Sequence, residues 1–269
     1  MSAAVGMTLI DGHPGDQVYI TERALQYGDG LFETIACHAG QPRWLPLHLQ
    51  RLRKGCERLQ FAFDAYDALT GEVAQLAGGQ GRCIVKVIVS RGCATRRGYR
   101  PGGNEQPTRI VTRYDWPPER DGAGLRVGIS AVRLGSNALL AGLKHLNRLE
   151  QVLAQLSCPT GIDEVLMLSE AQQVIGGSMS NVFFADGEGL FTPDLRACGV
   201  EGVMRRVVIE VARDLPLSVR PVAVAELSGV REAFVTNVRW GVRSVTALDG
   251  RALHSDDYAR QLRRLIGDA

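Results

Sequence analysis

The chain has 269 residues, a formal net charge of +2 and a pI near 8.3. A chain of this length can bury a substantial core, either as one large domain or as two smaller ones. Because acidic and basic residues nearly balance and no block of like charges occurs, neither a nucleic acid nor an acidic membrane is indicated as a partner.

The cysteines and the N-terminus limit the compartment and the kind of site. The six cysteines include no Cys-x-x-Cys pair, and their spacing to histidine does not suit zinc, so we expect no metal site. The first twelve residues lack a charged region followed by a long apolar core, and no window reaches 18 apolar residues. We therefore expect a soluble cytoplasmic protein with reduced thiols.

The first part of the chain contains both strand and helix patterns. Residues 22–30 and the Gly- and Arg-rich residues 91–103 are typical of loops. Apolar runs predict strands at 7–10, 31–37, 82–90 and 108–114, and helical spacing predicts helices from Leu47 and over 65–76.

A proline-containing segment divides the chain. Pro117 and Pro118 break helices and sheet ladders alike, so we expect residues 115–122 to be an interdomain linker. This predicts a small N-terminal α/β domain over residues 1–114 and a larger C-terminal domain over residues 123–269.

The second part also mixes helices and strands, so the predicted fold class is mixed α and β. No Gly-x-Gly-x-x-Gly or Walker motif occurs, which disfavours dinucleotide and nucleotide binding. Strands are predicted at 125–132, 164–169, 182–185 and 233–237, and helices at 148–156, 204–214 and 256–266.

Lysine is rare in this chain, which makes each of its three lysines informative. Arginine carries nearly all other positive charge and cannot lose its proton near neutral pH, whereas lysine can. Lys54 lies on the polar side of a predicted helix and is expected to be solvated. Lys86 interrupts an apolar strand, so it points either into water or into a cleft.

Lys144 is the strongest candidate for a reactive amine. It follows an apolar stretch and precedes Asn147 and Glu150, which can cap a helix reciprocally. Apolar surroundings at a fixed helix start favour an uncharged, nucleophilic amine. The alternative is a lysine that reaches the surface with its charged end.

Three further segments are candidates for binding an anion. Arg51 provides a planar guanidinium that suits a phosphate if it faces inward. Glycines in residues 198–206 precede a predicted helix, whose first N–H groups would face a phosphate. Thr236 and Asn237 follow a strand. A reactive lysine with a distributed phosphate site suggests pyridoxal 5′-phosphate (PLP).

The order of these motifs resembles the 4-amino-4-deoxychorismate lyases, which belong to the class IV, branched-chain-aminotransferase-like group of PLP enzymes. The resemblance covers nearly the whole chain. It is carried by Arg23-Ala24-x-x-Tyr27-Gly28-Asp29-Gly30-x-Phe32-x-Thr34, His48-Leu49-Gln50-Arg51-Leu52, Ser90-Arg91-Gly92 with Arg97-Gly98-Tyr99, residues 144–151, and Gly199-Val200-x-Gly202-Val203-Met204-Arg205.

The resemblance implies a fold-type IV PLP enzyme with a barrel-like sheet in the C-terminal domain, PLP between the domains, and a homodimer. It implies that Lys144 forms the Schiff base and that Thr34 passes a proton to the leaving group. The phosphate-binding positions are Arg51, the backbone at Val203 and Met204, and the region of Asn237. Arg97 and Tyr99 match a loop that contacts the substrate.

One position departs from the family pattern. A glutamate that pairs with the pyridine nitrogen usually precedes the asparagine of the motif Ser180-Asn181-Val182-Phe183 by five residues, but Gly176 stands there. Without a carboxylate the ring is a weaker electron sink. Elimination forms an aromatic product that helps drive the step, so a lyase tolerates this loss better than an aminotransferase.

We therefore predict a lyase that converts 4-amino-4-deoxychorismate to 4-aminobenzoate and pyruvate, a step toward folate. One alternative is a class IV aminotransferase acting on branched-chain or D-amino acids. The other is a member of the group that binds a ligand without turnover, which Gly176 motivates.

Overall fold

The computed structural model describes residues 5–118 and 124–267. The chain divides into two units, one formed by Met1–Arg120 with Leu143–Asn147 and the other by Asp121–Gly142 with Arg148–Ala269. Residues 119–122 of the predicted linker lie outside the described residues, and the predicted domain limits stay a prediction. The prediction of one linker did not include a later segment of the first unit, whereas Leu143–Asn147 belongs to that unit.

The first unit is built on a six-stranded sheet with the strand order β2-β1-β6-β5-β3-β4. Its paired neighbours are all antiparallel. The strands are β1 (Val5–Ile10), β2 (His13–Pro14), β3 (Gly30–His38), β4 (Gln41–Pro42), β5 (Arg82–Ser90) and β6 (Arg109–Asp115).

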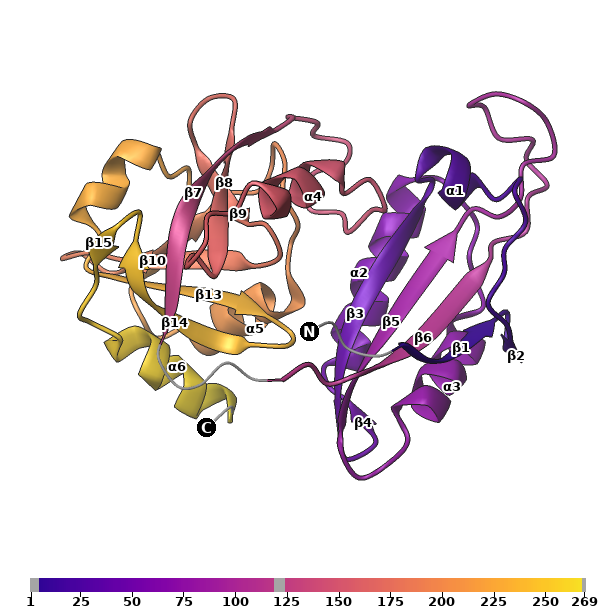
Figure 1. Cartoon of the computed structure of the whole chain (residues 1–269), viewed down its shortest axis with the longest axis horizontal. Helices are drawn as coiled ribbons and strands as arrows, with labels where there is room; N and C mark the ends of the chain where they lie inside the picture. Colours follow the sequence, from indigo (N-terminus) through magenta and orange to yellow (C-terminus); the bar gives the residue numbers. More distant parts are fainter. Residues whose placement is uncertain (1–4, 119–123, 268–269) are drawn as a thin grey trace. The chain divides into compact units, whose positions relative to one another are not determined.

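One face of this sheet is apolar and covered. Val85, Val87 and Val89 alternate along β5, and each is at most 1% exposed. The helices α2 (Leu45–Arg58) and α3 (Tyr66–Ala77) pack on this face (Figure 1). The other face carries Thr34 directly opposite Lys86.

Gly55 sets how closely α2 approaches the sheet. A Cβ atom on Gly55 would lie 2.6 Å from the Cδ1 atom of the buried Leu31 on β3, so a side chain there would force Leu31 to move. The same side of α2 carries the buried His48, Leu52 and Cys56, at helical spacing. This contact brings the helix surface around His48 against β3.

The predicted loop over residues 22–30 contains a short helix, α1 (Arg23–Tyr27). Glu22 caps its start, since its side chain accepts a hydrogen bond from the amide of Ala24. Gly28 ends the helix with a left-handed backbone at φ 64°. A one-turn helix shows too little periodicity to be predicted from sequence.

The second unit is built on a nine-stranded sheet with the order β12-β11-β10-β13-β14-β7-β8-β9, and β15 pairs with β14. Because the terminal strand β9 leads through a three-residue turn into the inner strand β10, the sheet must curl, as expected for a barrel-like sheet. The strands are β7 (Leu125–Leu134), β8 (Glu164–Ser169), β9 (Val174–Gly177), β10 (Asn181–Ala185), β11 (Leu190–Pro193), β12 (Leu217–Arg220), β13 (Glu232–Asn237), β14 (Gly241–Leu248) and β15 (Arg251–Ala252).

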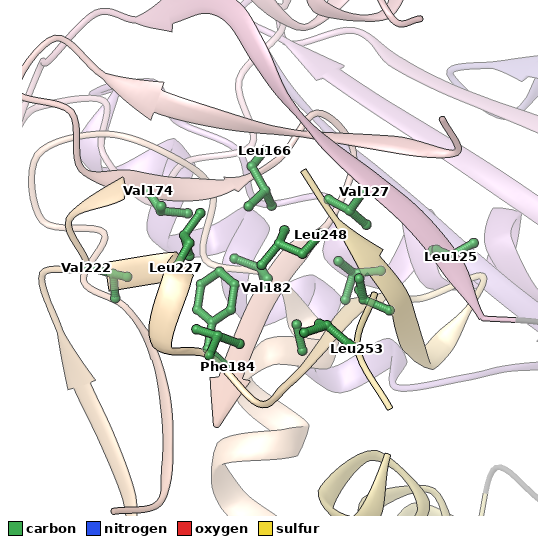
Figure 2. Packing of buried hydrophobic residues seen from close by; sticks show 14 of the residues in the cluster. Leu125, Val127, Leu166, Val174, Val182, Phe184, Val222, Leu227, Leu248 and Leu253 are labelled. Carbon is green, nitrogen blue, oxygen red and sulfur yellow. The ribbon is translucent and has the colours of Figure 1, made fainter. Parts of the chain in front are cut away.

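Apolar side chains from several strands fill the concave side of this sheet. Leu166, Val182 and Phe184 are each at most 1% exposed and pack in one cluster with Leu248 (Figure 2). The helices of this unit are α4 (Leu149–Leu156), α5 (Val203–Val211) and α6 (Asp257–Ile266), with a 3₁₀ helix at Val224–Gly229. Within the described residues, no helix is both long and apolar enough to cross a membrane.

Candidate active site

Lys144 lies in a segment that extends the six-stranded sheet. The amide of Phe32 donates to the carbonyl of Lys144 at 2.9 Å, and the amide of Leu146 donates to the carbonyl of Gly30 at 3.0 Å. Leu31 and His145 form an antiparallel bridge. These bonds hold the lysine backbone on both sides against the start of β3.

The glycine-containing turn before β3 makes room for this segment. A Cβ atom on Gly30 would lie 2.9 Å from Leu146 Cδ1, and one on Gly28 would lie 2.5 Å from Asn147 Oδ1. Asp29 fixes the turn because its carboxylate accepts hydrogen bonds from both Arg23 and Arg91. The Tyr-Gly-Asp-Gly motif is therefore part of the lysine's support.

The predicted cap by Asn147 and Glu150 is wrong. The N-cap residue of α4 is Arg148, without a side-chain cap bond. Asn147 instead donates to the carbonyl of Gly28 at 3.2 Å, and Glu150 accepts from the amide of Gly135 at 2.9 Å. Both side chains bind backbone groups far away in sequence, and such partners are invisible to a local capping pattern.

Phe32 lies beneath the amine of Lys144. The Lys144 Nζ atom is 4.1 Å from the ring centroid, and Lys86 Nζ is 5.6 Å from the same centroid. Both distances are within the range of a cation–π contact. Lys86 thus projects from the sheet face that carries Phe32 and Thr34, while Lys54 is exposed on α2, as predicted.

Arg51 is held by a buried carboxylate. Its Nε donates to Glu33 Oε1 at 2.8 Å, and its Nη2 pairs with Glu33 Oε2. His48 Nδ1 is 2.6 Å from the same Oε2. Glu33 is 3% exposed and His48 is fully buried, while the Arg51 side chain is 14% exposed, so the three side chains form one largely buried group between β3 and α2.

The charges of this group follow from burial and pairing. Burial alone would raise the pKa of Glu33, but Arg51 and His48 together lower it to about 2. Burial lowers the pKa of His48, and this outweighs the raising effect of Glu33. The stable state is therefore an ionised Glu33, a charged Arg51 and a neutral His48 that donates from Nδ1.

Arg97 and Tyr99 belong to a loop that Arg23 ties down. Arg23 Nη2 donates to the carbonyl of Tyr99 at 2.7 Å, and the Tyr99 ring meets the Tyr27 ring edge-on at a centroid distance of 5.4 Å. Tyr99 is 84% exposed, and Arg97 is exposed too. The backbone of the loop is fixed while both side chains remain accessible.

In the second unit, Val203 and Met204 are the first residues of α5. The first amides of a helix have no acceptor within the helix and carry its positive dipole end. Asn181 orients the segment before them: Oδ1 accepts from the amide of Gly202 at 3.1 Å, and Nδ2 donates to the carbonyl of Val200 at 2.9 Å. A Cβ atom on Gly202 would collide with Asn181 Oδ1.

The Asn237 side chain is used by its own turn. Its Oδ1 atom accepts from the amides of Arg239 at 3.0 Å and Trp240 at 2.8 Å. The neighbouring Thr236 is 1% exposed, and its hydroxyl has no hydrogen-bond partner among the described residues. Thr236 also lies directly opposite Asn181 in the β10–β13 register.

Gly176 provides no carboxylate, and the nearest acidic residue on the neighbouring strand is occupied. Glu164 is fully buried, and it accepts from the hydroxyls of Ser178 at 2.5 Å and Ser180 at 2.8 Å, and from the amide of Ser178 at 3.1 Å. A Cβ atom on Gly177 would lie 2.7 Å from Glu164 Oε2. Glu164 therefore builds the turn between β9 and β10.

The residues present suit the aldehyde and the phosphate of PLP, but they offer no carboxylate for its ring nitrogen. In the first unit, an amine at Lys144 and a guanidinium at Arg51 have chemistry that suits an aldehyde carrying a phosphate. In the second unit, the first amides of α5 and the Thr236 hydroxyl, which has no partner among the described residues, suit a phosphate. Gly176 offers no carboxylate that would favour a protonated pyridine nitrogen.

Glu33, His48 and Phe32 are site residues that motif reasoning did not single out for a role. A signal for Glu33 was present. It is the one acidic residue within the apolar run of residues 31–37, and strand alternation places it with Leu31 and Ile35 on the buried face. A buried carboxylate requires a partner, and His48 and Arg51 are three residues apart on the next helix.

Comparisons with known proteins agree over most of the chain. The amino-transferase class IV family model matches residues 30–248. An aminodeoxychorismate lyase of Vibrio harveyi is 32% identical over 90% of this chain and 91% of its own. The structure of 4-amino-4-deoxychorismate lyase from Pseudomonas aeruginosa is 39% identical, with a TM-score of 0.91 over 97% of this chain and 98% of that one.

A more distant structure shows the fold alone. The branched-chain aminotransferase of Thermoproteus uzoniensis is 20% identical, with a TM-score of 0.85 over 98% of this chain and 96% of that one. The predicted mixed α and β fold of this enzyme group is thereby confirmed.

Proposed function

We propose a function from the finding that the chain belongs to the amino-transferase class IV family. It is a PLP-dependent lyase that converts 4-amino-4-deoxychorismate to 4-aminobenzoate and pyruvate. The observation that carries this proposal is the near-full-length likeness to two proteins named for this lyase. The resemblance of the sequence motifs points the same way.

We propose that Lys144 binds PLP covalently and that Arg51 and the amides of Val203 and Met204 bind its phosphate. The backbone near Asn237 would complete the phosphate site, since the Asn237 side chain is held by its own turn. PLP supplies an electron-withdrawing ring conjugated to the substrate carbon that bears the amine. The backbone bond that holds Lys144 against β3 and the pairing of Arg51 with Glu33 support these roles.

The residues of the chain would then move two protons. With the substrate bound, the free amine of Lys144 would remove the proton from the substrate carbon that bears nitrogen. The carbon–oxygen bond to the enolpyruvyl group would break, and Thr34 would donate a proton to the departing group, which would become pyruvate. The ring left behind is aromatic 4-aminobenzoate. Arg97 and Tyr99 would contact a substrate carboxylate from their accessible loop.

Gly176 favours the lyase over an aminotransferase. A carboxylate that favours a protonated ring nitrogen would make PLP a stronger electron sink, which transamination needs more than elimination does. Elimination is assisted by product aromaticity instead. A chain without this carboxylate is therefore better suited to elimination.

Product analysis tests the proposal. Purified protein with PLP and 4-amino-4-deoxychorismate should release pyruvate and 4-aminobenzoate in equal amounts without any keto acid. Turnover that strictly requires a keto-acid acceptor would establish the aminotransferase instead. Cofactor binding without either reaction would identify a member of the group that lacks turnover.

We also propose a homodimer in the cytoplasm. Four apolar residues at helical spacing on α4 are 47–79% exposed, and a second copy of the chain would cover them: Leu149, Val152, Leu153 and Leu156. A reducing compartment suits the six free cysteines.

A further inference from the structure

We propose that Glu33 is a positioning residue that fixes the Arg51 guanidinium for the cofactor phosphate, so that the protein selects PLP over pyridoxal. This inference rests on the proposed binding of PLP by Lys144 and Arg51. Glu33 itself would touch neither the cofactor nor the substrate.

Both carboxylate oxygens of Glu33 bind Arg51, and one of them also binds His48. Oε1 accepts from Arg51 Nε at 2.8 Å, while Oε2 pairs with Arg51 Nη2 and lies 2.6 Å from His48 Nδ1. The two contacts to Arg51 form a fork that fixes the plane of the guanidinium, which one contact would not do. The plane of an arginine decides which oxygens it can bind as a pair.

Burial makes this arrangement rigid. Glu33 is 3% exposed and His48 is fully buried, so water cannot replace a lost contact on their side. Gly55 allows α2 to approach β3 closely one turn further along, which keeps His48 and Arg51 within reach of Glu33. A neutral His48 adds a hydrogen bond without adding charge, so the ionised Glu33 balances Arg51.

A glutamine cannot replace this carboxylate. Its amide has one acceptor oxygen and one donor NH₂ group, whereas the guanidinium and the imidazole present three donors to Glu33. In Glu33→Gln, one N–H group of Arg51 would therefore face another donor. We expect the Arg51 guanidinium to lose its fixed orientation. Lys144 should stay in place, because backbone bonds to Gly30 and Phe32 hold its segment.

The experiment compares PLP with pyridoxal, which has the same aldehyde but no phosphate. Dissociation constants for both are measured from the visible absorbance of the linkage with Lys144, which borohydride must be able to trap. Glu33→Gln should weaken PLP binding about 10- to 100-fold and leave pyridoxal binding within about twofold. A residue that merely stabilises the fold would weaken both equally.

Glu72→Gln is the matched control. Glu72 is another buried carboxylate of the first unit that holds an arginine, with Arg109 Nη2 at 2.9 Å and Nε at 3.1 Å from its Oε1. Its loss should lower thermal stability but leave the preference for PLP over pyridoxal unchanged. A loss of preference in Glu72→Gln as large as in Glu33→Gln would overturn the proposal.

A double variant tests whether Glu33 acts through Arg51. Arg51→Lys alone should lose the preference for PLP, and adding Glu33→Gln should reduce it no further. Full additivity of the two losses would show that Glu33 acts independently.

Glu33→Asp is the substitute variant if Glu33→Gln does not fold. Its carboxylate keeps the charge, but its side chain is too short to bind Arg51 with both oxygens. An unchanged preference for PLP in Glu33→Asp would contradict the proposal.

The outcomes separate this inference from the proposed function. If wild-type protein forms no borohydride-reducible linkage with either aldehyde, the proposed cofactor and this inference both fail. If the linkage forms at Lys144 and Glu33→Gln keeps the wild-type preference, only this inference fails.

Discussion

The Nζ atom of Lys144 lies 4.1 Å from the centroid of the Phe32 ring, and the backbones of the two residues are joined by a hydrogen bond of 2.9 Å. The amine is therefore positioned by the same strand that carries Glu33 and Thr34 on alternate faces. Strand β3 thus connects the proposed reactive amine, the proposed proton donor and the support of the arginine.

Lys144→Ala should abolish covalent cofactor binding. The wild-type protein with PLP is expected to absorb visible light, and this absorbance should be absent from the variant. After borohydride reduction and digestion, mass spectrometry should find the cofactor on the peptide that contains Lys144. A reduced linkage at Lys86, which lies 5.6 Å from the same aromatic ring, would contradict the assignment.

Thr34→Val should lower kcat by about 10²- to 10⁴-fold if the hydroxyl donates the proton to the leaving group. Valine has nearly the same shape, so the strand and the cofactor spectrum should be unchanged. Thr34→Ser keeps the hydroxyl and should retain most of the activity. Equal activity of the valine and serine variants would remove Thr34 from the chemistry.

Gly176→Glu should raise activity or shift the cofactor absorbance, because the added carboxylate would favour protonation of the pyridine nitrogen. A Cβ atom at this position would lie 3.0 Å from the carbonyl oxygen of Ser180, so we expect a stability cost of about 1–3 kcal/mol. Gly176→Ala is the matched control, since it adds the Cβ atom without the charge.

The two Gly176 variants should therefore lose similar stability and differ in spectrum or rate. If neither spectrum nor rate differs between them, another group or a water molecule already serves the ring nitrogen. Rates are compared with saturating PLP, and stability is compared in the absence of cofactor.

The buried Glu33 should make the free energy of unfolding depend on pH in the acid range. Its pKa in the folded protein is about 2, below the ordinary 4.5, so its ionised form stabilises the fold above pH 4.5. This contribution is lost as the pH falls from 4.5 through about 2. The difference in unfolding free energy between wild type and Glu33→Gln should therefore shrink over that interval, as measured by urea unfolding; a constant difference would contradict it.

Leu156→Glu should separate the proposed homodimer into monomers. Leu156 is 79% exposed at the end of the apolar stripe on α4, and a charge buried there in a dimer would be costly. Leu265→Glu is the control, because Leu265 is 54% exposed on α6, away from the stripe in sequence. Sedimentation should show a lower mass for the first variant only; unchanged mass in both would place the interface elsewhere.

Sequence patterns predicted many elements because burial alternates regularly in them. The strand at Arg82–Ser90 was predicted with its observed limits, since Val85, Val87 and Val89 are buried on one face. Strand β14 (Gly241–Leu248) was not predicted, although it lies inside the second sheet. Its polar residues Arg243 and Ser244 interrupt the apolar pattern, so its pairing with β13 and β7 determines it.

The site was predictable where chemistry is carried by rare residue types or by motifs. Lys144 and Arg51 stand out for that reason, whereas Phe32 and Glu33 acquire their roles only through contacts across β3. The failure of the Asn147 and Glu150 cap has the same origin. Both side chains bind backbone groups that local spacing does not reveal.

The return of residues Leu143–Asn147 to the first unit has a consequence for synthesis on the ribosome. The segment that is bridged to the start of β3 is made after the rest of that unit and after strand β7 of the next. We expect a nascent chain ending near residue 118 to lack this segment and to expose the backbone groups of Gly30 and Phe32 that bind it. Two separately produced fragments cut near residue 120 should accordingly reassemble, the second supplying the missing segment to the first.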